Sequence, residues 1–139
     1  MKNRFQKKIF WAINKLLFWL PAVMYMALIY HLSSAPPPQT ARAFPVLFEI
    51  KVLHIIEYAG LAALILFAVH NTADLPFKWA AAYSIMLTYI YGLTDELHQV
   101  FVPCRGPSLI DPFANLAAAY LAMAAVYYLR GKTNRRRRS

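Results

Sequence analysis

The sequence contains one cysteine and few acidic residues. Cys104 has no second cysteine to pair with in the 139-residue chain, so the fold does not depend on an internal disulfide. Six Asp and Glu residues oppose fifteen Lys and Arg residues, which gives a formal net charge of +9. The chain is also too short for two ordinary domains, and we expect one compact unit.

The surplus of basic residues is concentrated in the two tails of the chain. The tails hold eleven of the fifteen: Lys2, Arg4, Lys7, Lys8, Lys15, Arg130, Lys132 and Arg135 to Arg138. Basic tails that flank apolar helices are typical of segments retained on the cytoplasmic side of a membrane. The C-terminal arginines follow an apolar run directly and have no aromatic residues among them on which bases could stack. We therefore predict no binding of nucleic acid.

Hydrophobic residues make up 60% of the chain, and four apolar runs approach the length that crosses a bilayer. We predict an all-α fold, an integral membrane bundle of four transmembrane helices, with spans at about 16–33, 52–70, 76–95 and 112–130. These lie in a membrane domain of residues 16–130. Residues 1–15 are predicted to form a basic interfacial segment, and residues 131–139 a disordered basic tail. Residues 33–50, with several prolines, are predicted to form a linker outside the apolar runs.

The distribution of basic residues predicts the orientation of the bundle. With both termini in the cytoplasm, that side holds twelve Lys and Arg residues, namely the eleven of the tails and Lys78. Only Arg42, Lys51 and Arg105 then lie outside. Because loops rich in Lys and Arg remain cytoplasmic, we predict that both termini are cytoplasmic. Four spans then place the polar ends of the second, third and fourth helices together on the outer side.

Four polar residues mark the start of the second apolar run. Lys51, His54 and Tyr58 recur at helical spacing and share one face of the predicted helix. Glu57 lies one turn from His54. Polar groups that share a stripe on a membrane helix favour a functional site or a polar network over simple packing.

A second polar group lies between the third and fourth apolar runs. Its candidate site residues are Asp95, Glu96, Gln99, Arg105, Ser108, Asp111 and Asn115. Ionisable groups at the end of a membrane helix are costly and usually face a bundle interior or a watery cavity. Two simpler explanations stay open. The charges can pair with one another in a solvated loop at the membrane edge, and Asp111 before Pro112 can serve only to cap the last helix.

These two groups of residues resemble the VanZ-like family, small bacterial membrane proteins named for a protein linked to teicoplanin resistance. The first family pattern, Lys-x-x-His-x-x-x-Tyr, is matched by Lys51, His54 and Tyr58. The second is Asp-Glu-x-x-Gln-x-Phe-x-Pro-x-Arg-x-x-Ser-x-x-Asp-x-x-x-Asn. It is matched in register by Asp95, Glu96, Gln99, Phe101, Pro103, Arg105, Ser108, Asp111 and Asn115.

The resemblance covers residues 33–121 and includes two departures. Cys104 stands before the arginine, and alanines occupy 117–119 after the asparagine, where family members often have glycine. The resemblance implies a multi-pass protein of the bacterial plasma membrane that acts in the cell envelope. It also implies an effect on susceptibility to glycopeptide or lipid-targeting antibiotics.

The charge balance of the predicted site restricts the ligands that it can hold. The two cationic residues Lys51 and Arg105 oppose four carboxylates, and His54 and His98 can add positive charge when protonated. A receptor for phosphate alone normally has an excess of Arg and Lys. The balance favours either an internal ion-pair network with protonated acids or a site that also holds a cation.

Three hypotheses about function follow. In the first, the site binds an envelope lipid, a lipid-linked precursor or an antibiotic, or relays protons in a small transporter, without changing a covalent bond. The predicted binding residues are Lys51, Glu57, Tyr58, Asp95, Gln99, Ser108, Asp111 and Asn115. In the second, the protein is an enzyme in which His54 or Glu96 is the general base and Arg105 binds an anionic headgroup. In the third, the polar network only holds the helices together.

The lipid bilayer is the predicted partner, and no metal or cofactor is predicted. Asp95 with His98, and His54 with Glu57, could each supply two metal ligands one turn apart, and Glu96 could add a third. Pairs of this kind are common in structural networks, so they do not by themselves predict a metal site.

Overall fold

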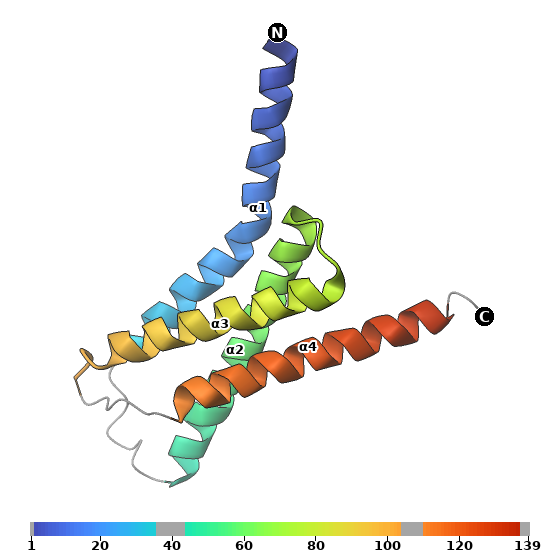
Figure 1. The fold of residues 1–139 in the computed structure, drawn as a ribbon. Coiled ribbons are helices and arrows are strands. Elements are labelled where there is room, and N and C mark those ends of the chain that lie inside the picture. Colours follow the sequence, from blue (N-terminus) through green and yellow to red (C-terminus); the bar gives the residue numbers. More distant parts are fainter. Residues whose placement is uncertain (1, 36–43, 104–109, 137–139) are drawn as a thin grey trace.

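The computed structural model describes residues 2–35, 44–103 and 110–136, and within them it does not describe the side chains of residues 2–5, 7–10, 12, 44–51 and 134. The described chain forms four helices (Figure 1): α1 (Lys2–Ser33), α2 (Phe44–Thr72), α3 (Phe77–Gln99) and α4 (Asp111–Arg136). No strand occurs among these residues, and the prediction of an all-α fold is confirmed.

The first helix is continuous from Lys2 to Ser33. The predicted interfacial segment, residues 1–15, is therefore not a separate element, because residues 2–15 continue the helix that follows. Pro21 lies inside α1, and the helix changes direction along its length, so that its N-terminal half projects away from the other helices (Figure 1). A proline within a helix removes a backbone hydrogen bond and produces such a bend.

Two predicted boundaries were wrong. Residues 44–50 were expected in a linker, but α2 begins at Phe44 with Pro45 in its first turn. Proline is tolerated there because the backbone N–H groups of a first helical turn have no intrahelical partner. Residues 131–136 were expected in a disordered tail, but α4 continues to Arg136. Arg135 and Arg136 in its last turn interact favourably with the helix dipole, which supports this extension.

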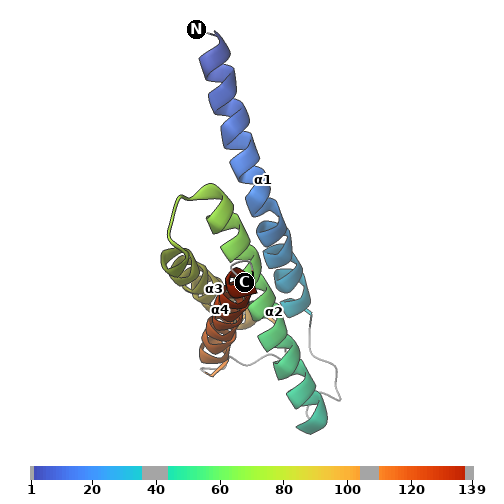
Figure 2. The same cartoon turned by 90° about the vertical axis from the view of Figure 1, so that its right-hand side faces the viewer.

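The second helix is the centre of the bundle and packs against each of the other three. Figures 1 and 2 show the C-terminal half of α1 running beside α2, and α3 and α4 crossing α2 together. The contact surfaces are rich in small and branched residues, which allow close approach of helix backbones. The buried core includes Ala22, Tyr58, Leu61, Ala62, Ile65, Ala80, Ala118, Ala119 and Met123.

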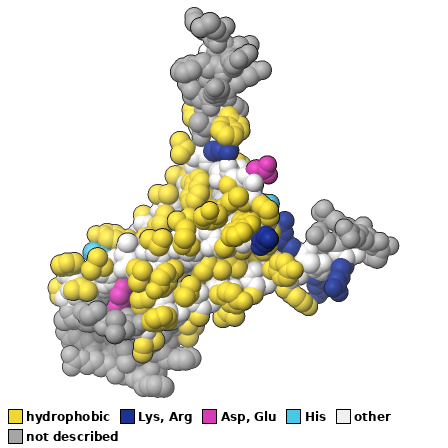
Figure 3. All heavy atoms as spheres, viewed as in Figure 1, with side chains coloured by type: hydrophobic (Ala, Val, Ile, Leu, Met, Phe, Trp, Pro, Cys, Tyr) yellow, Lys and Arg dark blue, Asp and Glu magenta, His cyan; other side chains and the backbone are white. Residues whose placement is uncertain are grey.

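Three helices contain segments that are long and apolar enough to cross a membrane: Ile13–Ser33, Val52–Thr72 and Asp111–Thr133. Large hydrophobic side chains cover much of the described surface that faces the viewer in Figure 3, as expected for helices that face lipid. The prediction of membrane spans is therefore supported for α1, α2 and α4.

The predicted span at residues 76–95 has a different character. It forms α3, which has 23 residues and is long enough to cross a bilayer. However, α3 does not reach the hydropathy of the other three, because tyrosine, serine and threonine residues interrupt its apolar sequence. Two of these polar side chains, Ser84 and Thr88, are buried against the neighbouring helices rather than exposed on the surface.

Candidate functional site

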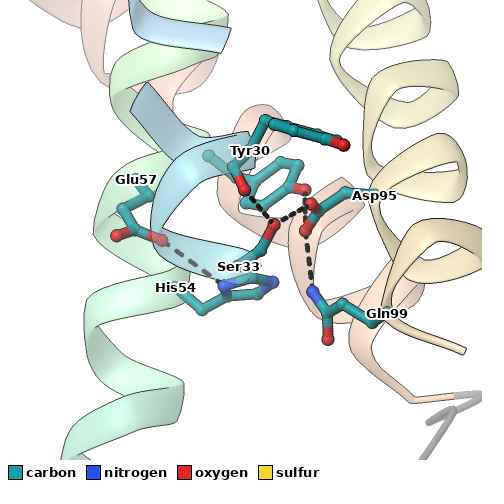
Figure 4. Close-up of polar contacts among 7 residues, drawn as sticks. Tyr30, Ser33, His54, Glu57, Asp95 and Gln99 are labelled. Carbon is teal, nitrogen blue, oxygen red and sulfur yellow. Dashed lines mark hydrogen bonds and ion pairs between the residues drawn. The ribbon is translucent and has the colours of Figure 1, made fainter. Parts of the chain in front are cut away.

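A buried carboxylate near the end of α3 joins three helices. Asp95 is 3% exposed. Its Oδ1 lies 2.6 Å from Ser33 Oγ of α1, and its Oδ2 accepts hydrogen bonds from Tyr58 of α2 at 3.2 Å and from Gln99 at 2.8 Å (Figure 4). All three of these donors are neutral. Hydrogen bonds to a carboxylate are stronger than those between neutral groups, so this network connects α1, α2 and α3 firmly.

Helical spacing explains why these side chains meet. Thr88, Gly92, Asp95 and Gln99 recur every three or four residues along α3, and all four are buried on its inner face. Tyr58, at 0% exposed, approaches the same face from α2. Asp95 and Gln99 lie one turn apart on α3 and are joined by a hydrogen bond.

The serine that contacts Asp95 has two acceptors within reach. Ser33 Oγ lies 2.6 Å from Asp95 Oδ1 and 3.1 Å from the carbonyl oxygen of Tyr30. A hydroxyl group carries one proton, so these two donations are alternatives. Ser33 therefore donates either to Asp95 or to the Tyr30 carbonyl, and it can turn from one acceptor to the other.

A second set of contacts fastens α1 to α3 beside Asp95. Ser34 Oγ donates to the carbonyl of Tyr30 at 2.6 Å and lies 3.0 Å from His98 Nε2. The contact between Ser34 and His98 therefore joins the end of α1 to the last turn of α3. The rings of Tyr30 and His98 also stack, with their centroids 4.3 Å apart. Farther along both helices, Tyr91 donates to the carbonyl of Met26 at 2.6 Å.

The His54 and Glu57 pair lies next to the Asp95 network and is partly open to its surroundings. His54 Nδ1 is 3.4 Å from Glu57 Oε2, and the two side chains are 21% and 25% exposed. The His54 ring is 4.9 Å from the ring of Tyr58, whose hydroxyl reaches Asp95. Tyr58 therefore separates this titratable pair of α2 from the buried carboxylate of Asp95. Because both side chains of the pair are partly exposed, they can still contact a ligand.

Asn115 is buried on α4 with an unused hydrogen-bond acceptor. The residue is 2% exposed, and within the described chain its Oδ1 has no hydrogen-bond partner. Its amide packs against Gly92, where an added Cβ would lie 3.1 Å from both Asn115 Nδ2 and a ring carbon of Tyr58. Thr88, one turn before Gly92, also has a buried hydroxyl oxygen without a partner among the described residues. A buried polar atom without a partner is costly, and such atoms are rare.

The other predicted site residues are only partly described. Glu96 and Asp111 are partly buried and take part in further interactions. Lys51 lies in α2 one turn before His54, but its side chain is not among those described. Arg105 and Ser108 lie outside the described residues. Asp111 and Pro112 were expected to mark the N-terminus of the last helix, and α4 begins at Asp111. The negative charge of Asp111 in the first turn interacts favourably with the positive end of the helix dipole.

No family model, no curated protein and no solved structure matches this chain. The resemblance to the VanZ-like family therefore rests on the motif residues alone. What the protein does is inferred from those residues and their contacts.

The sequence did not point to the residues that α1 contributes. Ser33 and Ser34 stood at the start of the predicted linker, and Tyr30 was only one of many aromatic residues in an apolar run. The available signal was the pair of hydroxyl residues that directly follows a membrane-length helix. Among the described residues, no group of three or more His, Cys, Asp or Glu side chains is arranged to hold a metal ion.

Proposed function

We propose that this chain is a VanZ-like membrane protein of the bacterial cell envelope. Its polar end binds an envelope lipid, a lipid-linked precursor, or a lipid-targeting or glycopeptide antibiotic such as teicoplanin. The observation that carries the proposal is the convergence of motif residues from three helices. Tyr58 of α2, Asp95 and Gln99 of α3, and Asn115 of α4 are all buried around the face of α3 that includes Gly92.

The residues at the polar end of the bundle have two different roles in this proposal. Asp95 is enclosed by three hydrogen bonds, so it positions α1, α2 and α3 rather than contacting a ligand. His54 and Glu57 are partly exposed beside it and supply the ligand contacts. Asn115 Oδ1 has no hydrogen-bond partner among the described residues, which would cost about 1–3 kcal/mol of stability, and a site that binds a polar group is a reason to retain such an atom.

One contact favours an enzyme as the second candidate. A histidine that is held by a carboxylate, as His54 is by Glu57 at 3.4 Å, has the arrangement of an oriented general base. In this alternative, His54 is the general base of a reaction on a lipid headgroup. Glu96 and Arg105 are then the other catalytic candidates, with Arg105 binding the anionic group.

The proposed topology has four spans, in which α3 crosses the membrane together with α1, α2 and α4. Both termini then lie in the cytoplasm. The polar side chains on the inner face of α3, namely Ser84, Thr88, Asp95 and Gln99, are buried by the other helices and do not face lipid. Reporter fusions at either terminus and after Thr72 should read cytoplasmic, and fusions near Gln39 and Pro107 extracytoplasmic. Three spans would place the termini on opposite sides, so a C-terminal fusion that reads extracytoplasmic contradicts the proposal.

The His54→Gln variant tests the ligand-binding role of the partly exposed pair. Expressed in a glycopeptide-susceptible Gram-positive bacterium, the unmodified chain should raise the minimum inhibitory concentration of teicoplanin. His54→Gln should lose most of that increase, because a hydrogen bond between the imidazole and a charged group of the ligand would be worth about 1.5 kcal/mol, or roughly tenfold in affinity.

The matched control is His70→Gln, which changes an exposed histidine at the other end of α2. It should leave tolerance and thermal stability unchanged. If His54→Gln lowers the unfolding temperature in detergent and tolerance in parallel, the pair is structural, and the binding proposal loses its main support. Lipids that copurify with the unmodified chain but not with His54→Gln, identified by mass spectrometry, would name the ligand.

A further inference from the structure

The end of the bundle opposite Asp95 collects basic and aromatic side chains around the turn between α2 and α3. Lys15 of α1 donates to the backbone carbonyl of Thr72, and the indole N–H of Trp19 donates to Thr72 Oγ1 at 3.3 Å. Arg130 of α4 lies over the ring of Phe77, the first residue of α3. We call Lys15, Lys78 and Arg130 the basic end.

Each cation of the basic end is paired with an aromatic ring. Lys15 Nζ lies 3.9 Å from the centroid of Trp11, and Lys78 Nζ lies 5.7 Å from that of Trp79. Arg130 Cζ lies 4.7 Å from that of Phe77. An aromatic ring attracts a cation without neutralising it, so the positive charge stays available to an anion.

The described acidic residues lie mostly at the other end of the molecule. Glu57, Asp95, Glu96 and Asp111 belong to the Asp95 end, and the only acid described near the α2–α3 turn is Asp74. Figure 3 shows dark blue side chains along the side of the molecule that leads to the C-terminal part of α4, with one magenta group near them. Among the described side chains, the two ends therefore differ in charge.

We propose that the basic end is a docking surface for the headgroups of anionic phospholipids. The basic residues lie close to the limits of the membrane-length segments, which begin at Ile13 and end at Thr72 and Thr133. All three tryptophans of the chain, Trp11, Trp19 and Trp79, belong to the same region. Tryptophan beside Lys or Arg at a helix end is the composition of a membrane–water interface, where anionic lipids concentrate.

A lipid bound at the basic end would also affect the stability of the bundle. Within the described residues, α1 and α4 do not pack against each other, although each reaches the α2–α3 turn through Lys15 or Arg130. A phosphate between these cations would connect the first and last helices by charge. Bound anionic lipid should therefore stabilise the bundle, and this effect does not depend on the function proposed for the Asp95 end.

The test compares phosphatidylglycerol with phosphatidylcholine, added at equal mole fraction to the purified full chain in detergent. Phosphatidylglycerol should raise the unfolding temperature more than phosphatidylcholine does, and native mass spectrometry should show it bound preferentially. The difference should shrink at high salt, because exposed charges are screened. Equal effects of the two lipids would overturn the proposal, as would a stronger stabilisation by a single-stranded oligonucleotide than by phosphatidylglycerol.

Matched double variants locate the surface. Lys78→Gln with Arg130→Gln should reduce bound phosphatidylglycerol by about half or more, since two of three cations are lost. Lys132→Gln with Arg135→Gln removes the same charge from the exposed last turns of α4 and should retain binding. Lys78→Arg with Arg130→Lys keeps the charges and should also bind normally, which separates charge loss from misfolding. Equal losses in the two Gln pairs would show a general charge effect and would overturn the site.

Discussion

Asp95→Ala is expected to lower the free energy of unfolding by about 2–4 kcal/mol. The substitution removes the acceptor of three hydrogen bonds from Ser33, Tyr58 and Gln99, all within the buried part of the bundle. Each buried donor left without its acceptor costs about 1–2 kcal/mol, the lower part of the usual range. Ser33 can turn to the Tyr30 carbonyl, so the loss falls mainly on Tyr58 and Gln99. Reversible unfolding in mixed micelles measures the change.

Two further variants define the cause of that loss. Asp95→Asn keeps the size of the side chain and one oxygen acceptor, so its cost should be about half that of Asp95→Ala. Asp74→Ala changes a carboxylate in the exposed turn between α2 and α3 and should shift stability by no more than about 0.5 kcal/mol. If Asp95→Ala were no more costly than Asp74→Ala, the network would not hold the helices together.

Gly92→Leu is expected to destabilise the bundle by about 3 kcal/mol or more. Even a Cβ at this position would lie 3.1 Å from Tyr58 and from Asn115, which are 0% and 2% exposed and have no room to retreat. Added methylene groups in a packed core cost about 1–3 kcal/mol, and occasionally more. Leucine gains about 1 kcal/mol in helix propensity over glycine, which the steric clash should exceed. Gly92→Ala should show the same direction with a smaller loss.

The matched control for this prediction is Gly131→Ala on α4. A Cβ at Gly131 would meet nothing within 4 Å, and the residue is exposed. Removing a glycine from an open helical position should therefore stabilise the protein by about 0.5–1 kcal/mol. Opposite signs for Gly92→Ala and Gly131→Ala in the same unfolding assay would identify close packing as the reason for glycine at 92. Equal gains would show that α3 and α4 do not approach closely there.

The helical fold and part of the candidate site could be predicted because their signals are local. Long apolar runs give membrane-length helices whatever surrounds them, and this was sufficient for α1, α2 and α4. The spacing of Asp95 and Gln99 on α3, and of His54 and Glu57 on α2, places each pair one turn apart before any tertiary contact forms. Helix ends were less predictable, since Pro45 fits the first turn of α2 and residues 131–136, expected in a disordered tail, continue α4.

The sequence alone determined that this chain forms apolar helices with polar residues at particular ends, because hydrophobic runs and helical spacing are properties of neighbouring residues. Only the tertiary structure decided that Asp95 is enclosed by three donors while Glu57 stays partly exposed. Burial depends on residues far away in the chain, and Ser33 is 62 positions from the carboxylate that it contacts. The close approach of α3 and α4 at Gly92 has the same origin, since it requires Tyr58 and Asn115 to arrive there from two other helices.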